Sequence, residues 1–325
     1  MLYLLAGIEV EACNQHPAAK QRDQRLEGLS VLTRLHALAQ RLRVRPTYLV
    51  TYSAATDART ASVLREFREG RDCEIGAHHQ AWETPPYSEE GVRHRSYALQ
   101  LPADQFAAQV ASLTDAIAAA VGERPLSYRS GRFGFSASHV FDLERAGYRI
   151  ESSVAPMLYE RHLGGPDFVG APPTPYFLAY DDPIAPGTSN LLEVPVSAAL
   201  NRTVPAAIER LYGRLPFAGT TRSLLERLGV ARVQWLRPFS STLDDMCALA
   251  RRMRREGVPL LNLVLNSSDA FMDAGSAGST PLELERRFSR LEDVLAYVAN
   301  DLGAVPVTFS EFRSLYCGAQ SEPPS

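Results

Sequence analysis

The chain has 325 residues, of which 45% are hydrophobic and 22% charged, and its formal net charge is −3. This composition supports a sizeable core and excludes a disordered chain. The near-neutral charge argues against a nucleic-acid binder, which would need a basic patch. Lys20 is the only lysine, so Schiff-base or P-loop chemistry has no other candidate residue.

The cysteines and the apolar segments bear on the cell compartment. Cys13, Cys73, Cys247 and Cys317 are far apart and form no CxxC pair, which is typical of reduced thiols in a cytosolic protein. The apolar N-terminal run lacks a basic n-region and reaches Glu9 too early to span a bilayer, which needs about 20 apolar residues. We therefore predict a cytoplasmic protein without a membrane span.

Strand and helix patterns alternate along the chain. Strands are expected at 2–10, 47–52, 73–77, 126–129, 149–154, 191–197, 233–236, 260–265 and 305–309. Helices are expected at 26–42, 56–69, 104–121, 136–146, 242–256 and 280–300. This order predicts an α/β fold with a parallel sheet, arranged as one barrel-like domain over 1–318, with a disordered tail at 319–325. The loop at 155–190 is long for a connection and is a candidate lid or substrate loop.

In such barrels the chemistry lies where strands end. Glu9 and Glu11 end the first strand, and the alternation of a strand points both carboxylates to one side. They are either a solvated strand end or a pair that shares a proton or a metal. His78 and His79 end the third strand, and because neighbours on a strand face opposite ways, only one is expected to face the barrel mouth. Imidazole is a ligand for zinc, iron or nickel.

Two further strand ends carry polar residues. Arg129 and Arg132 stand among glycines, a pattern that suits the binding of an anion. Glu151 stands near the start of the next expected strand, at 149–154, and is a candidate ion-pair partner for either arginine. Asn266 and Ser267 follow a late apolar strand, where the amide of Asn266 can form hydrogen bonds but cannot transfer protons near neutral pH.

These segments together resemble the polysaccharide deacetylases, the NodB-homology family also called carbohydrate esterase family 4, and within it the WalW-like branch. The matching stretches lie in order over about residues 3–312: GIEVE at 7–11, EIGAHHQAWETPP at 74–86, SYRSGRFG at 127–134, GYRIESSVAP at 147–156, LLEVPVS at 191–197, WLRPFSS at 235–241 and LNLVLNSSDAFMDAGS at 261–276.

The resemblance implies a distorted (β/α) barrel of about seven parallel strands and a divalent metal, usually zinc. Such a metal polarises an acetamide carbonyl and activates a water. By position, Glu9 stands where the family has its base. Glu11 and His78 stand at metal-ligand positions. Arg129 or Arg132 matches the arginine that orients the base in the family. Glu151 matches an acidic residue of the family's fourth motif.

The chain departs from the family pattern at the metal site. A second metal histidine is expected two or four residues after His78, and Gln80 and Trp82 stand there. His79 or Glu83 is then the remaining candidate for a further ligand. Asn266 occupies the position of the late histidine that serves as general acid.

Three hypotheses follow. The first is a hydrolase of carbon–nitrogen bonds other than peptide bonds, deacetylase-like, with a remodelled metal site and an acetylated sugar or related amide as substrate. The second is an inactive member of the fold that binds a saccharide or a partner. The third is metal-free carbohydrate chemistry. Glycoside hydrolysis with two carboxylates is one form of it, but Glu9 and Glu11 lie on one strand and do not flank a substrate, which argues against that form.

Substrate contacts are expected from residues around the mouth. We predict Gln80, Trp82, Tyr128 and Ser267 as substrate-binding residues, with the aromatic rings offering stacking surfaces for a sugar. Phe133 and Trp235 are expected in the core.

Overall fold

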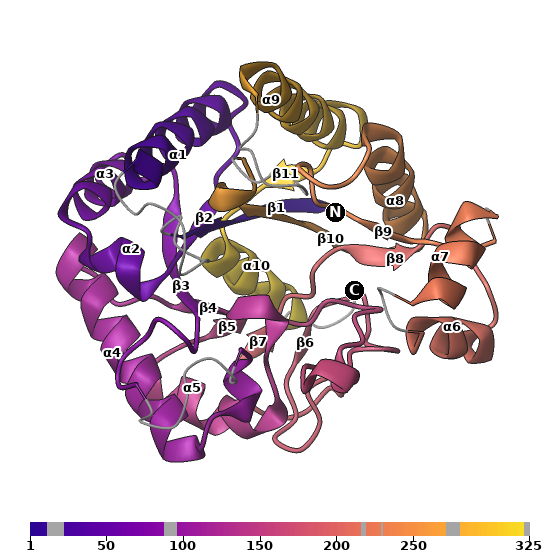
Figure 1. Cartoon of the computed structure of the whole chain (residues 1–325), viewed down its shortest axis with the longest axis horizontal. Coiled ribbons are helices and arrows are strands. Elements are labelled where there is room, and N and C mark those ends of the chain that lie inside the picture. The colour runs from indigo at the N-terminus through magenta and orange to yellow at the C-terminus, as the bar shows by residue number, and fades with distance from the viewer. Residues whose placement is uncertain (12–22, 88–95, 216–218, 229, 271–279, 322–325) are drawn as a thin grey trace.

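The computed structural model describes the chain apart from residues 12–22, 88–95, 216–218, 229, 271–279 and 322–325. Helices surround a curled sheet (Figure 1). The strands are β1 (Tyr3–Val10), β2 (Thr47–Val50), β3 (Glu74–His79), β4 (Ser127–Ser130), β5 (Ile150–Glu151), β6 (Tyr176–Phe177), β7 (Leu192–Glu193), β8 (Ala198–Leu200), β9 (Val233–Trp235), β10 (Leu260–Asn266) and β11 (Val305–Pro306).

The helices alternate with these strands. They are α1 (Asp23–Arg41), α2 (Tyr52–Thr56), α3 (Ala58–Glu69), α4 (Ala103–Val121), α5 (Val140–Ala146), α6 (Ala206–Gly213), α7 (Thr220–Arg227), α8 (Leu243–Arg255), α9 (Pro281–Ala296) and α10 (Phe309–Ser321). Among the described residues, none of the helices has the length and apolar character needed to cross a bilayer.

The main sheet has the strand order β10-β1-β2-β3-β4-β5-β7, with parallel pairing throughout this run. The order confirms the predicted distorted barrel of parallel strands. β6 adds an antiparallel edge beside β7, and β11 pairs with β1. Backbone hydrogen bonds to β10 link the two ends of the curl: Ser197 donates to Asn262 O over 3.1 Å, and Val264 donates to Leu236 O over 3.0 Å.

Several predicted strands are shorter than expected. The stretches 149–154 and 191–197 contain only the two-residue strands β5 and β7. Pro195 has no N–H to donate, so regular pairing cannot continue through it. The stretch at 233–236 is not a barrel strand, because β9 pairs antiparallel with β8 in a separate two-stranded sheet.

The loop at 155–190 is packed against the barrel. Phe168, Tyr176 and Leu178 are buried, and β6 lies within it. The predicted disordered tail begins at 319, but α10 runs to Ser321; residues 322–325 lie outside the described part of the chain.

Alternation along the strands divides the core into two layers. Leu4, Ala6 and Ile8 of β1 belong to the large apolar cluster under the outer helices. Leu5 belongs to a second cluster inside the curl, with members from six elements and their flanks: Leu49, Ile150, Leu192, Val194, Leu260, Val307, Phe309 and Phe312. The α10 phenylalanines thus fill one end of the barrel interior, and α10 lies across that end (Figure 1). The inward positions beyond Leu5 are Gly7 and Glu9.

Candidate active site

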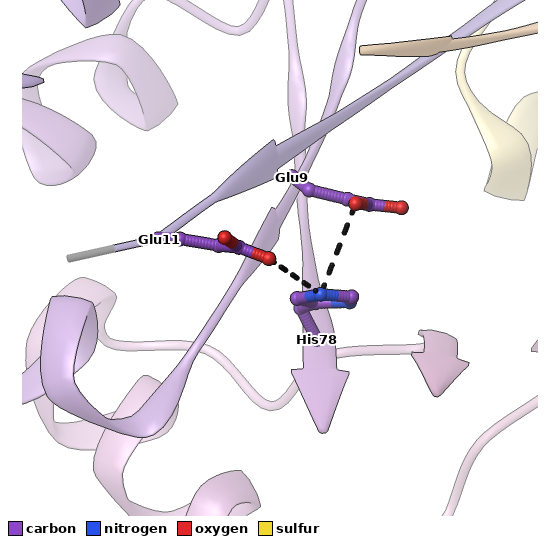
Figure 2. A group of neighbouring side chains, drawn as sticks. All are labelled: Glu9, Glu11 and His78. Atoms are coloured by element: carbon purple, nitrogen blue, oxygen red, sulfur yellow. Dashed lines mark hydrogen bonds and ion pairs between the residues drawn. The ribbon is translucent and has the colours of Figure 1, made fainter. Parts of the chain in front are cut away.

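The first strand places two carboxylates inside the barrel. Glu9 ends the inward row of β1 and Glu11 follows two residues later, so both side chains point the same way (Figure 2). Both are buried, at 7% and 6% exposure. Gly7 precedes them in this row, and a Cβ there would lie 2.9 Å from Nη1 of Arg129. The glycine therefore makes room for the guanidinium beneath Glu9.

His78 reaches the same point from β3. Its Nε2 lies 3.1 Å from Oε1 of Glu11 and 3.9 Å from Oε2 of Glu9 (Figure 2). Burial by itself lowers the pKa of His78, but the two nearby carboxylates outweigh it and raise that pKa above its usual value. Its Nδ1 is buried and has no hydrogen-bond partner among the described residues.

These three side chains form a group that fits a divalent metal. One ligand atom from each of Glu9, Glu11 and His78 lies within 4.8 Å of the other two. Carboxylate and imidazole groups beside an open cavity are the ligand types of a catalytic metal site. A divalent cation would also offset the cost of holding two buried carboxylates together.

Arg129 supports Glu9 from below. Its side chain is fully buried, and its Nη1 donates to Oε1 of Glu9 over 3.2 Å. Its other donors bind Ser152, with Nε donating to the carbonyl over 2.7 Å and Nη2 to Oγ over 2.8 Å. Asn262 donates to the same Oγ over 2.9 Å. This network fixes the guanidinium, which forms a buried ion pair with Glu9.

Gln80 and the segment after β10 complete the surroundings of Glu11. Nε2 of Gln80 donates to Oε1 of Glu11 over 2.6 Å, and Oγ of Ser268 donates to its Oε2 over 3.4 Å. The backbone N–H of Glu11 donates to Oγ of Ser267 over 3.3 Å. Asn266 lies in register with Glu9, and its Oδ1 accepts hydrogen bonds from the N–H and the hydroxyl of Ser268, both 2.8 Å long.

Three predicted site residues lie outside this group, on the outer face of the sheet. His79 is hydrogen-bonded at 2.8 Å through Nδ1 to the hydroxyl of Tyr128 and at 2.8 Å through Nε2 to Gln109. Burial lowers the pKa of His79 to about 4. The structure therefore does not place His79 as a ligand beside His78, nor Tyr128 at the mouth. Both residues lie under α4, because the alternation of β3 and β4 turns them outward.

Glu151 also stands apart from the cavity. It accepts a hydrogen bond from Ser153 N over 2.9 Å and pairs in register with Glu193 of β7. Burial raises the pKa of both carboxyls, so one proton is favoured between them. Its predicted place beside Arg129 or Arg132 as an ion pair is not observed. Glu83 likewise lies outside the group, in a neighbouring cavity, where Ser53 Oγ donates to it over 2.9 Å.

A cavity of about 730 Å³ contains the group. Of the predicted residues it is lined by Glu9, Glu11, His78, Gln80, Trp82, Arg132 and Asn266. Phe133 and Trp235, expected in the core, are half-buried and line this cavity, with ring centroids 6.0 Å apart. Ser267 lines the neighbouring cavity instead.

The sequence prediction missed Arg237, Asp269 and Tyr97, which also line the cavity. Arg237 follows β9 and Asp269 follows β10. The same rule that selected Glu9 and His78, polar residues just beyond a strand, applies to both of them.

Comparison with known proteins identifies the fold. No family model and no curated protein matches the chain. Among solved structures, a protein of Mycobacterium smegmatis described as a polysaccharide deacetylase aligns with a TM-score of 0.58 at 17% identity, over 100% of this chain and 93% of that one. A protein of Parabacteroides distasonis described as a glycoside hydrolase/deacetylase aligns with a TM-score of 0.64 at 14% identity, over 97% and 70%.

A third solved structure, Puue allantoinase, aligns with a TM-score of 0.54 at 14% identity, over 100% of this chain and 92% of that one. At these identities the likeness concerns the fold and not the substrate. The chain therefore has the fold of the polysaccharide deacetylases.

Proposed function

We propose that the protein is a metal-dependent hydrolase of the polysaccharide deacetylase type, of the WalW-like branch, which removes an acyl group from an acetylated sugar or related amide. The observation that carries the proposal is the buried group of Glu9, Glu11 and His78 at the strand ends, open to a cavity of about 730 Å³. The solved structures of this fold that are described as deacetylases support it.

Glu11 and His78 would hold the metal, with zinc the expected ion. A bound divalent ion supplies Lewis-acid polarisation of the acyl carbonyl and lowers the pKa of a bound water. Glu9 is the proposed base, because Arg129 orients its carboxylate at the edge of the group through a 3.2 Å hydrogen bond. Asn266 stands where the family has its general acid. Because Ser268 donates to its Oδ1, its Nδ2 would donate a hydrogen bond to the negative charge that develops on the acyl oxygen in the transition state.

One observation favours an alternative, an inactive member of the fold that binds a saccharide. Gln80 donates a 2.6 Å hydrogen bond to the carboxylate oxygen of Glu11 that also faces His78. This contact occupies an oxygen that a metal would use, so the two functions differ first in metal content.

The metal content of the purified full chain therefore tests the proposal. Elemental mass spectrometry should find about one divalent ion per chain in the wild type and none in His78→Ala. The matched control is His162→Ala, because His162 is exposed on a surface turn. Protein that stays metal-free after incubation with zinc, iron or manganese would exclude this mechanism and leave the binding protein.

A further inference from the structure

The cavity contains a second charged feature, centred on Arg237. Its Nη2 donates to Oδ2 of Asp269 over 2.8 Å, and its Nε is buried without a hydrogen-bond partner among the described residues. The side chain of Arg237 is among those that line the cavity of about 730 Å³. The charges of Asp269, Glu9 and Glu11 together raise the pKa of Arg237 against the effect of burial, which places the guanidinium within the field of the metal group.

The turn that carries Arg237 is held rigidly. The backbone carbonyl of Arg237 accepts hydrogen bonds from the N–H groups of Ser240 over 3.1 Å and Ser241 over 2.8 Å. Arg290 of α9 donates to the carbonyls of Pro238 and Ser241, over 3.2 and 3.0 Å. A guanidinium fixed by its own turn and by Asp269 loses little entropy when it binds a ligand.

Arg132 enters the same cavity from a strained turn. Arg132 and Phe133 have φ values of 53° and 57°, a left-handed conformation that costs a residue with a side chain. Gly131 permits the turn, since a Cβ there would lie 3.0 Å from the carbonyl oxygen of His79. The guanidinium lies over the ring of Trp82, 5.4 Å from its centroid. Among the described residues no carboxylate lies within ion-pair distance of it.

The acidic residues on this side of the cavity already have partners. Glu160 accepts a hydrogen bond from the hydroxyl of Tyr97, and Glu226 accepts one from Arg222 over 3.1 Å. Asp269 is engaged by Arg237. Arg132 interacts with the hydroxyl of Tyr97, which in turn donates to Glu160, so among the described residues no carboxylate pairs with Arg132 directly. Trp82 and Trp235 line the same cavity.

We propose that Arg132 and Arg237 form an oxyanion subsite, so that the ligand of this cavity is an acidic sugar carrying a carboxylate or a phosphate group. Guanidinium groups bind both oxyanions through paired hydrogen bonds, and the tryptophans would stack against the sugar ring. The binding of an acidic sugar is inferred from the cavity alone. The reaction of that sugar rests on the proposed function.

Calorimetric titration of the full chain tests the subsite with three probes: glucose, glucuronate and glucose 1-phosphate. We expect at least one acidic sugar to bind the wild type about tenfold more tightly than glucose. A preference for glucuronate identifies the anion as a carboxylate, and a preference for glucose 1-phosphate identifies it as a phosphate. Equal affinity for all three sugars, or no binding of either acidic sugar, overturns the proposal.

Variants then identify the residues. Arg132→Gln and Arg237→Gln should each abolish the preference, while Arg237→Lys retains part of it. Arg124→Gln, which removes an exposed ion pair with Asp115, is the matched control and should bind like the wild type. An arginine that only balanced Glu9 and Glu11 would change metal content without changing the ratio of affinities. A preference that survives in both glutamine variants contradicts the assignment.

The subsite and the proposed function fail separately. Metal-dependent hydrolysis of neutral acetylated sugars without a preference for acidic ones would retain the hydrolase and reject the subsite. Preference for acidic sugars in a protein that binds no metal would retain the subsite on a binding protein and reject the hydrolase.

Discussion

The two neighbouring histidines of β3 lie in opposite environments. His78 faces two carboxylates inside the barrel, and they raise its pKa. His79 faces Tyr128 and Gln109 under the outer helices, where burial lowers its pKa to about 4. The residue type is the same and the positions are adjacent, so the difference comes from the alternation of the strand alone. The inner face of the sheet carries the candidate chemistry, and the outer face uses its polar groups to hold helices.

The largest expected effect comes from removing charge on the inner face. Glu11→Gln keeps the size of the side chain but removes a carboxylate that faces His78, so metal-dependent hydrolysis should fall at least about 100-fold. Steady-state kinetics with the metal-loaded protein measures this. Glu83→Gln, in the neighbouring cavity, is the matched control. A Glu11→Gln protein with wild-type rates would show that the inner face does not hold the reaction.

The outer face should respond in stability instead of metal binding. His79→Leu removes the hydrogen-bond partner of the Tyr128 hydroxyl and of the amide oxygen of Gln109, at a cost of about 1–3 kcal/mol for each buried group left unsatisfied. Urea unfolding should show this loss. Metal content should stay at the wild-type value, and a loss of metal in this variant would abolish the distinction between the two faces.

A further effect on stability is expected from pH. His139 is stacked on Phe106 in the outer layer, and burial lowers its pKa to about 3. Between about pH 6.5 and pH 3 the unfolded chain therefore holds a proton on this residue that the folded chain does not. Stability falls as the pH falls through this window, by about 1.4 kcal/mol per pH unit for one such proton.

Unfolding free energies of the wild type and His139→Phe, measured from pH 7 to pH 4.5, check this sign. The variant should have the shallower slope, because its unfolded state takes up one proton fewer. Parallel slopes would show that His139 is already protonated in the folded protein.

Much of the architecture could be predicted from local pattern. Alternating apolar strands and helices indicated a barrel-like parallel sheet, and the strand-end rule selected Glu9, Glu11 and His78, which the structure brings together. The pattern also showed that only one of His78 and His79 faces inward. It could not show which, because that depends on the register of β3 between β2 and β4.

Other features depended on long-range packing. Tyr128 and Glu151 sit at strand ends but point outward, so position in sequence did not reveal their surroundings. The pairing of β9 with β8 outside the barrel was hidden because a short apolar strand reads the same in either sheet. Trp235 of β9 therefore lines the cavity, where an apolar pattern predicts core.

The cluster that fills the barrel beneath Glu9 has a consequence for turnover. Leu5, Leu49, Phe309 and Phe312 occupy the end of the interior opposite the strand tips. In the proposed hydrolase, sugar, water and released acid would therefore use the opening at the strand tips, one replacing another. A deacylated product bound by Arg132 and Arg237 would block the next substrate. The affinity of these arginines for the product would therefore limit the rate of product release.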